Sequence, residues 1–237
     1  MKSVSCLACP NNNCLIQRFG STKMMAEIDK IKAQNWYKKG HYIITEGSPV
    51  TGLYFIYKGK VKVVSEGFMG KEHIVRLANN GHVIGHRGYG GEIYPVGTVA
   101  IDETVACFID NEAINEAFIE YPKFAVALMM FYSQELRRTE KRIKYLSQMT
   151  VRDKIAEAIL YLIDIFGIQK DTNIIDVKLS REEISNLAGT NADQVSRAIS
   201  ELCKEGILGT EKKNITILDY EKLKEIVKAY DLYFIYV

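Results

Sequence analysis

The pattern of the sequence changes abruptly at Tyr121-Pro122, and the two sides of this point predict different architectures. Before it, residues 36–110 consist of short apolar runs separated by glycines, a pattern typical of strands and tight turns in a closed β-fold. After it, residues 122–150 contain no glycine and no proline other than Pro122, and their apolar residues follow a helical period. The sequence therefore predicts a β-roll, built as a double-stranded jelly roll, followed by one long helix.

The long helix carries apolar residues at alternating steps of three and four, with polar and charged residues between them. This is the pattern of a coiled-coil seam, although it lasts only about three heptads and a helix packed on its own domain can show it too. We expect a homodimer formed through this helix. The expected interface residues are Met129, Tyr132, Leu136, Thr139, Ile143 and Leu146.

The last third of the chain shows the local signals of two short helices joined by a tight turn. Ser180 and Glu183 have the spacing of a capping box, so a helix should begin there. It should stop at Gly189, and a second amphipathic helix should follow and end at Gly206. Two short strands with residues 211–213 at their tip then form a wing. Helix, turn, helix and wing is an arrangement that projects a recognition helix into the major groove of DNA.

Bulk properties set limits on the class of protein. The net charge of +2 over 237 residues does not by itself indicate a polyanion partner, so a DNA-binding surface must come from local clustering. No apolar run approaches the roughly 20 residues of a membrane helix. Cys6, Cys9 and residues 11–13 occupy the place where a signal peptide would have its apolar core. We therefore expect a cytoplasmic protein with no membrane partner.

An enzyme is not expected. Jelly rolls also form cupin-like metalloenzymes, but these need a cluster of histidines and carboxylates on the barrel strands. The four histidines of this chain are scattered and show no metal-binding spacing. The sequence also lacks a nucleophile-elbow motif, a Walker A loop and a dinucleotide fingerprint.

The order of roll, long helix and winged helix resembles the Crp/Fnr family of bacterial transcription regulators. Residues 39–47, 53–59 and 81–85 resemble the glycine-bearing turns of the family's roll, and residues 180–208 resemble its helix-turn-helix. The resemblance covers nearly the whole chain and implies an α+β fold that binds double-stranded DNA and works with RNA polymerase. It implies four parts: a Cys-containing N-terminal segment (1–20), a cyclic-nucleotide-binding-like β-roll sensor domain (21–121), a dimerisation helix (122–150) and a winged helix-turn-helix DNA-binding domain (151–237).

The second helix of this motif carries the candidate base-reading residues. Asp193 to Arg197 is similar to the Glu-x-x-Ser-Arg pattern of the Fnr branch, with Asp one methylene shorter than Glu. The planar fork of Arg197 can bond guanine O6 and N7 together, and Asp193 can accept from a cytosine amino group. A solvated ion pair between the two is the alternative. The residues expected to contact DNA are Asp193, Ser196, Arg197, Asn191, Arg181, Lys212 and Lys213.

The sensor domain departs from the cyclic-nucleotide pattern of the family. Those relatives carry a Gly-Glu-Leu cassette followed by Arg-Ser/Thr-Ala, whereas here His86 replaces the Glu and residues 96–97 stand where the Arg is expected. Cyclic AMP is therefore not the expected ligand. A different small effector in the roll is one alternative for the signal, since Arg87 can still neutralise a phosphate. The expected pocket residues are Gly85, His86, Arg87 and Thr98.

The cysteines suggest a sharper hypothesis. Cys6, Cys9 and Cys14, with the distant Cys107, resemble the four cluster ligands of the oxygen-sensing Fnr proteins, although the third spacing is one residue shorter. The resemblance implies a [4Fe–4S] cluster on these thiols and a redox or gas signal. The alternatives are a structural zinc at the N-terminal trio and a plain core role for Cys107. We expect Cys203 to be a core residue and assign no role to the apolar tail 232–237.

Overall fold

The computed structural model describes residues 3–67 and 70–230, so the apolar tail 232–237 lies outside the described residues. The chain separates into two compact units, Met1–Gln134 and Glu135–Val237, and the boundary lies inside helix α4 (Pro122–Leu146). Among the described residues, no helix combines the length and the apolar character that crossing a membrane requires.

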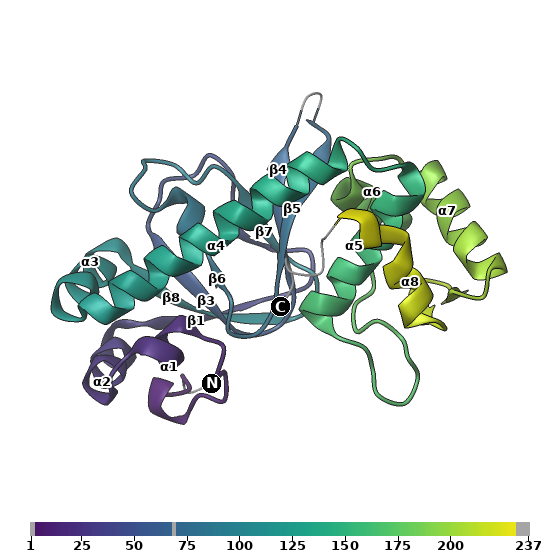
Figure 1. Ribbon diagram of the computed structural model, residues 1–237. Helices are drawn as coiled ribbons and strands as arrows, with labels where there is room; N and C mark the ends of the chain where they lie inside the picture. The colour runs from purple at the N-terminus through teal and green to yellow at the C-terminus, as the bar shows by residue number, and fades with distance from the viewer. Residues whose placement is uncertain (1–2, 68–69, 231–237) are drawn as a thin grey trace. The chain divides into compact units, whose positions relative to one another are not determined.

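The first unit is built around two four-stranded antiparallel sheets (Figure 1). One sheet has the strand order β1-β8-β3-β6 and the other the order β2-β7-β4-β5. The strands are β1 (Ala33–Tyr37), β2 (Tyr42–Ile44), β3 (Gly52–Lys58), β4 (Val61–Glu66), β5 (Glu72–Ala78), β6 (Val83–Ile84), β7 (Gly97–Ala100) and β8 (Thr104–Asp110). The predicted β-roll is confirmed.

The first unit has two layers of core because strand side chains alternate between the faces of a sheet. From β3, Ile56 points into the roll and packs in a cluster with Val63 and Ala106. Its neighbour Phe55 points to the outer face, where helices cover the sheet with residues such as Met24 and Phe124. These helices are α1 (Leu15–Phe19), α2 (Thr22–Ile31), α3 (Asn111–Glu120) and the first part of α4.

Gly52 shows how closely two central strands of this unit approach one another. A Cβ at this position would collide with the carbonyl oxygen of Ile109 on β8. Only glycine fits there without a shift of backbone, because a carbonyl oxygen at the end of a paired strand cannot yield as a flexible side chain does. The close approach fixes β3 beside β8, which carries Cys107.

The second unit contains the predicted helix-turn-helix and wing. Its further elements are α5 (Val151–Phe166), α6 (Arg181–Ala188), α7 (Ala192–Lys204), β9 (Leu208–Glu211), β10 (Asn214–Ile217) and α8 (Tyr220–Val227). The long helix ends at Leu146 rather than at residue 150. The reason is a capping box: Thr150 and Asp153 bond each other's backbone N–H groups and start α5.

Candidate functional site

The start of α6, its end and the start of α7 are each defined by residues that the sequence analysis identified. Ser180 Oγ accepts from the Glu183 N–H at 3.1 Å, and the Glu183 carboxylate accepts from the Ser180 N–H at 2.8 Å. Helix α6 ends at Gly189, whose φ of 66° is left-handed and favours glycine. Helix α7 begins after Asn191, whose side chain accepts from the Gln194 N–H at 2.9 Å. Local hydrogen bonds thus determine where α7 starts.

Helix α7 has one buried apolar face and one exposed polar face. Val195, Ile199 and Leu202 are buried in the second unit, whereas Asp193, Ser196 and Arg197 are exposed. In the part of the chain that the structure describes, Asp193 and Arg197 form no ion pair with each other. Both side chains are therefore open to an external ligand.

The remaining residues expected to contact DNA lie around this face. Lys212 and Lys213 form the exposed tip between β9 and β10, where Lys212 adopts a positive φ of 55°. Asn191 is exposed at the start of α7, while Arg181 opens α6 and is only half-exposed. Cys203 is half-buried on α7, with its Sγ 4.0 Å from Thr210 Oγ1 of the wing, so it is less enclosed than the core position we expected.

Arg142, a half-buried cation that the sequence analysis missed, connects the end of α4 to α5 and α6. Arg142 Nη2 donates to the carbonyl oxygen of Leu187 at 2.7 Å, and its guanidinium lies 5.3 Å from the ring centre of Tyr161. Its Nε is 3.8 Å from a carboxylate oxygen of Glu157, which is 2% exposed. The sequence held one indication of such a cation: Glu157 is an acidic residue inside an otherwise apolar stretch of α5. Arg142 thus joins α4 to the carbonyl end of α6.

The four cysteines of the predicted ligand set line one pocket of the first unit. Cys6 lies in a short 3-10 turn, Cys14 precedes α1, and Cys107 lies on β8. Cys6 and Cys14 are buried, and Cys9 and Cys107 are half-buried. Residues 93 positions apart in sequence, Cys14 and Cys107, therefore meet at the same cavity. The apolar wall of the pocket is formed by Ile16, Ile28, Phe55 and Ile109.

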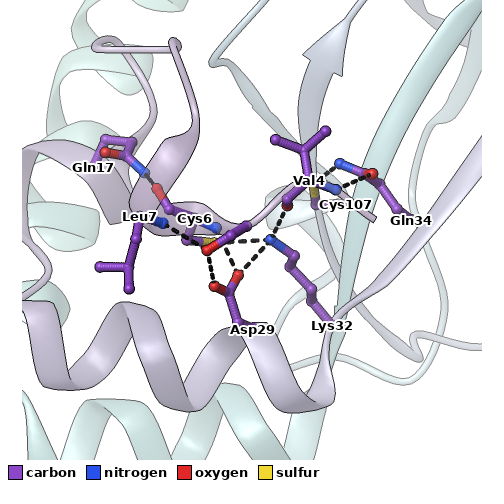
Figure 2. A network of polar contacts seen from close by, with 9 residues as sticks. Val4, Cys6, Leu7, Gln17, Asp29, Lys32, Gln34 and Cys107 are labelled. Atoms are coloured by element: carbon purple, nitrogen blue, oxygen red, sulfur yellow. Dashed lines mark hydrogen bonds and ion pairs between the residues drawn. The ribbon is translucent and has the colours of Figure 1, made fainter. Parts of the chain in front are cut away.

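A polar network beside the pocket holds the N-terminal segment on α2 (Figure 2). The Asp29 carboxylate accepts from the Ser5 hydroxyl, from the Cys6 N–H at 2.6 Å and from Lys32 Nζ at 2.6 Å. Burial raises the pKa of Asp29, but these hydrogen bonds outweigh it and lower the pKa to about 2. The carboxylate is therefore ionised and acts as the hub of the network.

The thiols surround the pocket, but in this conformation they are not placed as ligands of a single metal ion. Within the described ranges, no three His, Cys, Asp or Glu side chains are arranged to hold a metal ion. The pocket encloses about 20 Å³, roughly the space of one water molecule. Burial raises the pKa of Cys6 to about 12 and that of Cys14 to about 11, so these thiols are protonated in this conformation. Four thiols around one cavity are nevertheless the donor set that iron–sulfur groups use, once metal replaces the protons.

The four residues expected to form an effector pocket lie on β7 and around a short 3-10 helix, His86–Gly88. Gly85 adopts a left-handed φ of 81° before this helix, and Thr98 is 1% exposed on β7. His86 is 3% exposed, and its ring packs edge-on against Phe131 and Tyr132 of α4. Burial, together with the charges of Arg76 and Arg87, holds the pKa of His86 well below its usual range. The imidazole is therefore a neutral packing group between roll and helix.

The outer face of α4 exposes apolar side chains. Met129, Leu136 and Ile143 are 63%, 60% and 66% exposed, and their spacing of seven puts them on one stripe. Thr139 is exposed and Leu146 half-exposed near the same stripe. Tyr132 differs, since it is half-buried and its hydroxyl donates to the carbonyl oxygen of His86. Tyr132 thus packs on its own roll and offers less to a partner than the sequence predicts.

Two family models match the chain. A cyclic nucleotide-binding domain matches residues 34–121, and a Crp-like helix-turn-helix domain matches residues 153–226. The first match covers the β-roll from the second residue of β1 onward, and the second runs from the first turn of α5 to the last turn of α8. The matched ranges therefore contain the pocket strand β8 and the recognition helix α7.

Several regulators resemble the chain over most of their length. It is 28% identical over 207 residues to the transcriptional activator protein FnrA of Stutzerimonas stutzeri, covering 87% of this chain and 85% of that protein. It is 26% identical over 208 residues to the CRP-like cAMP-activated global transcriptional regulator of Mycobacterium tuberculosis, covering 85% and 88%. The solved structure of FixK2 from Bradyrhizobium japonicum has a similar fold, with a TM-score of 0.74 and 22% identity over 83% of this chain and 97% of that one.

Proposed function

Because the chain belongs to the Crp/Fnr family of transcription regulators and is a DNA-binding regulator, we propose that its input is a redox or gas signal. The sensor would be a [4Fe–4S] cluster held by Cys6, Cys9, Cys14 and Cys107. The observation that supports this proposal is the convergence of all four thiols on one pocket of the first unit.

The cluster, when bound, supplies an oxygen-labile redox centre. Because the closed pocket has room for about one water molecule, loading the cluster would require the stretch that carries Cys9 and Cys14 to move outward. Cys107 stays on β8, which is paired with β1 and β3 in the middle of its sheet. Cys6 is held by Asp29 and Lys32, so the stretch that carries Cys9 and Cys14 is the part that we propose changes with the signal.

Helix α4 is the element that we propose carries the signal. In the first unit, it is attached to the roll through Tyr132 and the ring of His86. In the second unit, Arg142 attaches its other end to the carbonyl of Leu187 at the end of α6. A shift of α4 between two dimer arrangements would then reposition the helices that precede α7.

The DNA interface that we propose consists of the exposed face of α7 with the wing. Arg197 would bond guanine in the major groove, Asp193 would accept from a cytosine amino group, and Ser196 would contact a base or a phosphate. Asn191, Arg181, Lys212 and Lys213 would contact phosphates, which position the protein without reading sequence. A palindromic operator with half-sites about one helical turn apart, roughly 34 Å, fits a dimer formed through α4. We also propose RNA polymerase as a protein partner. The proposed location is the cytoplasm, because the DNA lies there.

The test compares anaerobically purified wild type with Cys107→Ser after reconstitution with ferrous iron and sulfide. We expect the wild type to hold iron and acid-labile sulfide and to change its operator affinity when air is admitted. Cys107→Ser should hold less of both and show a smaller change. If the wild type holds no more iron than the variant, the cluster is wrong, and an effector in the roll near His86 and Arg87 becomes the better explanation.

A further inference from the structure

Two of the four sulfurs in the pocket accept hydrogen bonds from side chains only two positions apart in sequence. Lys32 Nζ lies 3.2 Å from Cys6 Sγ, and Gln34 Nε2 lies 3.3 Å from Cys107 Sγ (Figure 2). Both distances fall within the range of hydrogen bonds to sulfur, which are longer than those to oxygen. The cysteines are 101 positions apart, yet one short stretch of chain supplies a donor to each.

The donor at Cys6 is a buried and oriented charge. The side chain of Lys32 is 2% exposed, and its ammonium group also donates to the Val4 carbonyl at 2.6 Å and to Asp29 at 2.6 Å. Asp29 in turn accepts from the backbone N–H of Cys6. Three acceptors around one ammonium leave it little freedom, so Lys32 points at the Cys6 sulfur in a fixed direction.

The position of Gln34, which donates to Cys107, is set by the register of β1 on β8. Gln34 on β1 lies directly opposite Cys107 on β8 in the antiparallel pair. Its other amide atom, Oε1, accepts from the Val4 N–H at 3.0 Å. Gln34 thus bonds both the strand cysteine and the backbone just before Cys6, and so fixes the N-terminal segment relative to Cys107.

We propose that Lys32 and Gln34 are positioning residues that hold Cys6 and Cys107 and, by donating to their sulfurs, slow the oxidation of the bound cluster. This inference rests on the proposed sensor function. Hydrogen bonds to cluster sulfurs and nearby positive charge stabilise electron density on the sulfurs, which is one way a protein tunes the oxygen stability of such a group. Asp29 supports the arrangement by orienting Lys32.

Matched variants separate this role from simple stabilisation of the fold. Lys32→Met removes the donor to Cys6, and Lys30→Met is the control, because it removes the same charge from an exposed position only two residues earlier, in the last turn of α2. Gln34→Glu keeps the acceptor for the Val4 N–H but loses the amide donor to Cys107. Lys32→Arg keeps a charged donor and should restore most of the wild-type behaviour. If Lys32→Met fails to fold, Gln34→Glu and Lys32→Arg still show whether the donors act on the cluster or only on the stability of the fold.

Each protein is reconstituted anaerobically with ferrous iron and sulfide, and two properties are measured. Iron affinity against a chelator should fall by about 10- to 100-fold in Lys32→Met and Gln34→Glu. The visible absorption of the cluster should also bleach faster in air in these two variants than in Lys30→Met. A purely structural role would change thermal stability without changing the bleaching rate of the protein that is loaded.

The outcomes distinguish this inference from the function on which it rests. If the wild type loads iron and sulfide, but Lys32→Met and Gln34→Glu bind iron and bleach as Lys30→Met does, the inference is wrong and the sensor proposal stands. If the wild type loads no more iron than Cys107→Ser, both are wrong. Faster bleaching and weaker iron binding in both variants, with recovery in Lys32→Arg, would support the assignment.

Discussion

Helices α4 and α7 each have one face with buried apolar side chains, but they expose opposite kinds of surface. On α4, Phe124, Ala127 and Leu128 are buried, and the open face carries Met129, Leu136 and Ile143. On α7, the buried face is equally apolar, but the open face carries Asp193, Ser196 and Arg197. The two helices thus have similar buried faces and differ in the chemistry of their exposed faces.

The difference indicates the kind of partner that each helix takes. An apolar stripe on a helix gains free energy when a second protein surface removes it from water. A stripe of charged and hydroxyl side chains gains little from such burial but can bond the edges of bases and the phosphates of DNA. We therefore propose that α4 forms the dimer and that α7 recognises DNA, and the predictions below test this division.

The largest effect is expected from charges on the stripe of α4. Leu136→Glu combined with Ile143→Glu would bury four unpaired carboxylates in a symmetric dimer, which costs far more than the interface can supply. We expect monomers in sedimentation. Loss of the second half-site should also weaken operator binding by about 10²- to 10⁴-fold, the usual gain from two linked binding modules.

The matched control changes two residues of the same helix that are also seven positions apart, each of them next in sequence to a residue of the stripe. Arg137 and Lys144 are exposed, and replacing both by Glu leaves the apolar stripe intact. This control should still sediment as a dimer. An unchanged dimer in the Leu136/Ile143 variant would overturn the assignment of α4.

A smaller effect is expected from Arg197→Ala on α7. Loss of a bidentate contact to guanine should cost about 1–3 kcal/mol on the cognate operator and flatten discrimination at one base pair. Lys212→Ala at the wing tip provides the contrast, because loss of a phosphate contact should weaken binding to all sequences alike and lower the salt dependence. Titrations of operator and of single-base variants measure both. Equal weakening on every sequence by Arg197→Ala would make Arg197 a phosphate contact.

The packing of the buried His86 ring against α4 predicts that the stability of the fold depends on pH. The pKa of His86 in the folded roll lies well below the 6.5 of a free histidine, because burial favours the neutral ring. The stability that this neutral ring contributes is complete above about pH 6.5 and is lost as the pH falls below it, by about 1.4 kcal/mol per unit. His86→Phe should reduce this loss, since it keeps a ring against Phe131 and Tyr132.

The single tryptophan, Trp36 on β1, reports unfolding of the roll in this experiment. Urea unfolding followed by Trp36 fluorescence at about pH 7.5 and about pH 5.5 gives the change in free energy for wild type and variant. His41→Gln is the control, because His41 is exposed and should leave the acid destabilisation as in the wild type. The explanation fails if His86→Phe loses as much stability in acid as the wild type does.

The DNA-binding half could be predicted closely because local chemistry decides it. A capping box at Ser180, a left-handed glycine at 189 and an amphipathic repeat up to Leu202 each fix structure over a few residues. The end of the long helix was harder to predict. Thr150 continues the apolar spacing, but it also caps α5, and the structure shows that the cap decides.

The pocket could be predicted only through its cysteines, which a resemblance marked as a set. Lys32 and Gln34 lie in a mixed polar segment with no pattern, and their contacts depend on the register of β1 on β8. Arg142 likewise sits among many charged residues of α4, and only the three-dimensional fold shows that it reaches Leu187. Side chains that act across distant parts of a chain leave little trace in local spacing, because their partners are set by tertiary pairing.

The smallest predicted effect concerns Asn191, which has a local role in α7 and a proposed role on DNA. Its side-chain oxygen accepts from the Gln194 N–H, so Asn191→Ala should destabilise the second unit by about 1 kcal/mol. Aspartate caps a helix about as well as asparagine, so Asn191→Asp should leave thermal stability, followed by circular dichroism, close to the wild type.

The same Asn191→Asp change would place a negative charge where we propose a phosphate contact. Operator affinity should therefore fall at low salt, and the loss should shrink as added salt screens the repulsion. A purely structural Asn191 predicts the reverse pattern, with Asn191→Ala weakening DNA binding through stability and Asn191→Asp binding as the wild type does. The salt dependence of Asn191→Asp would therefore show whether the exposed start of α7 contacts a charged partner.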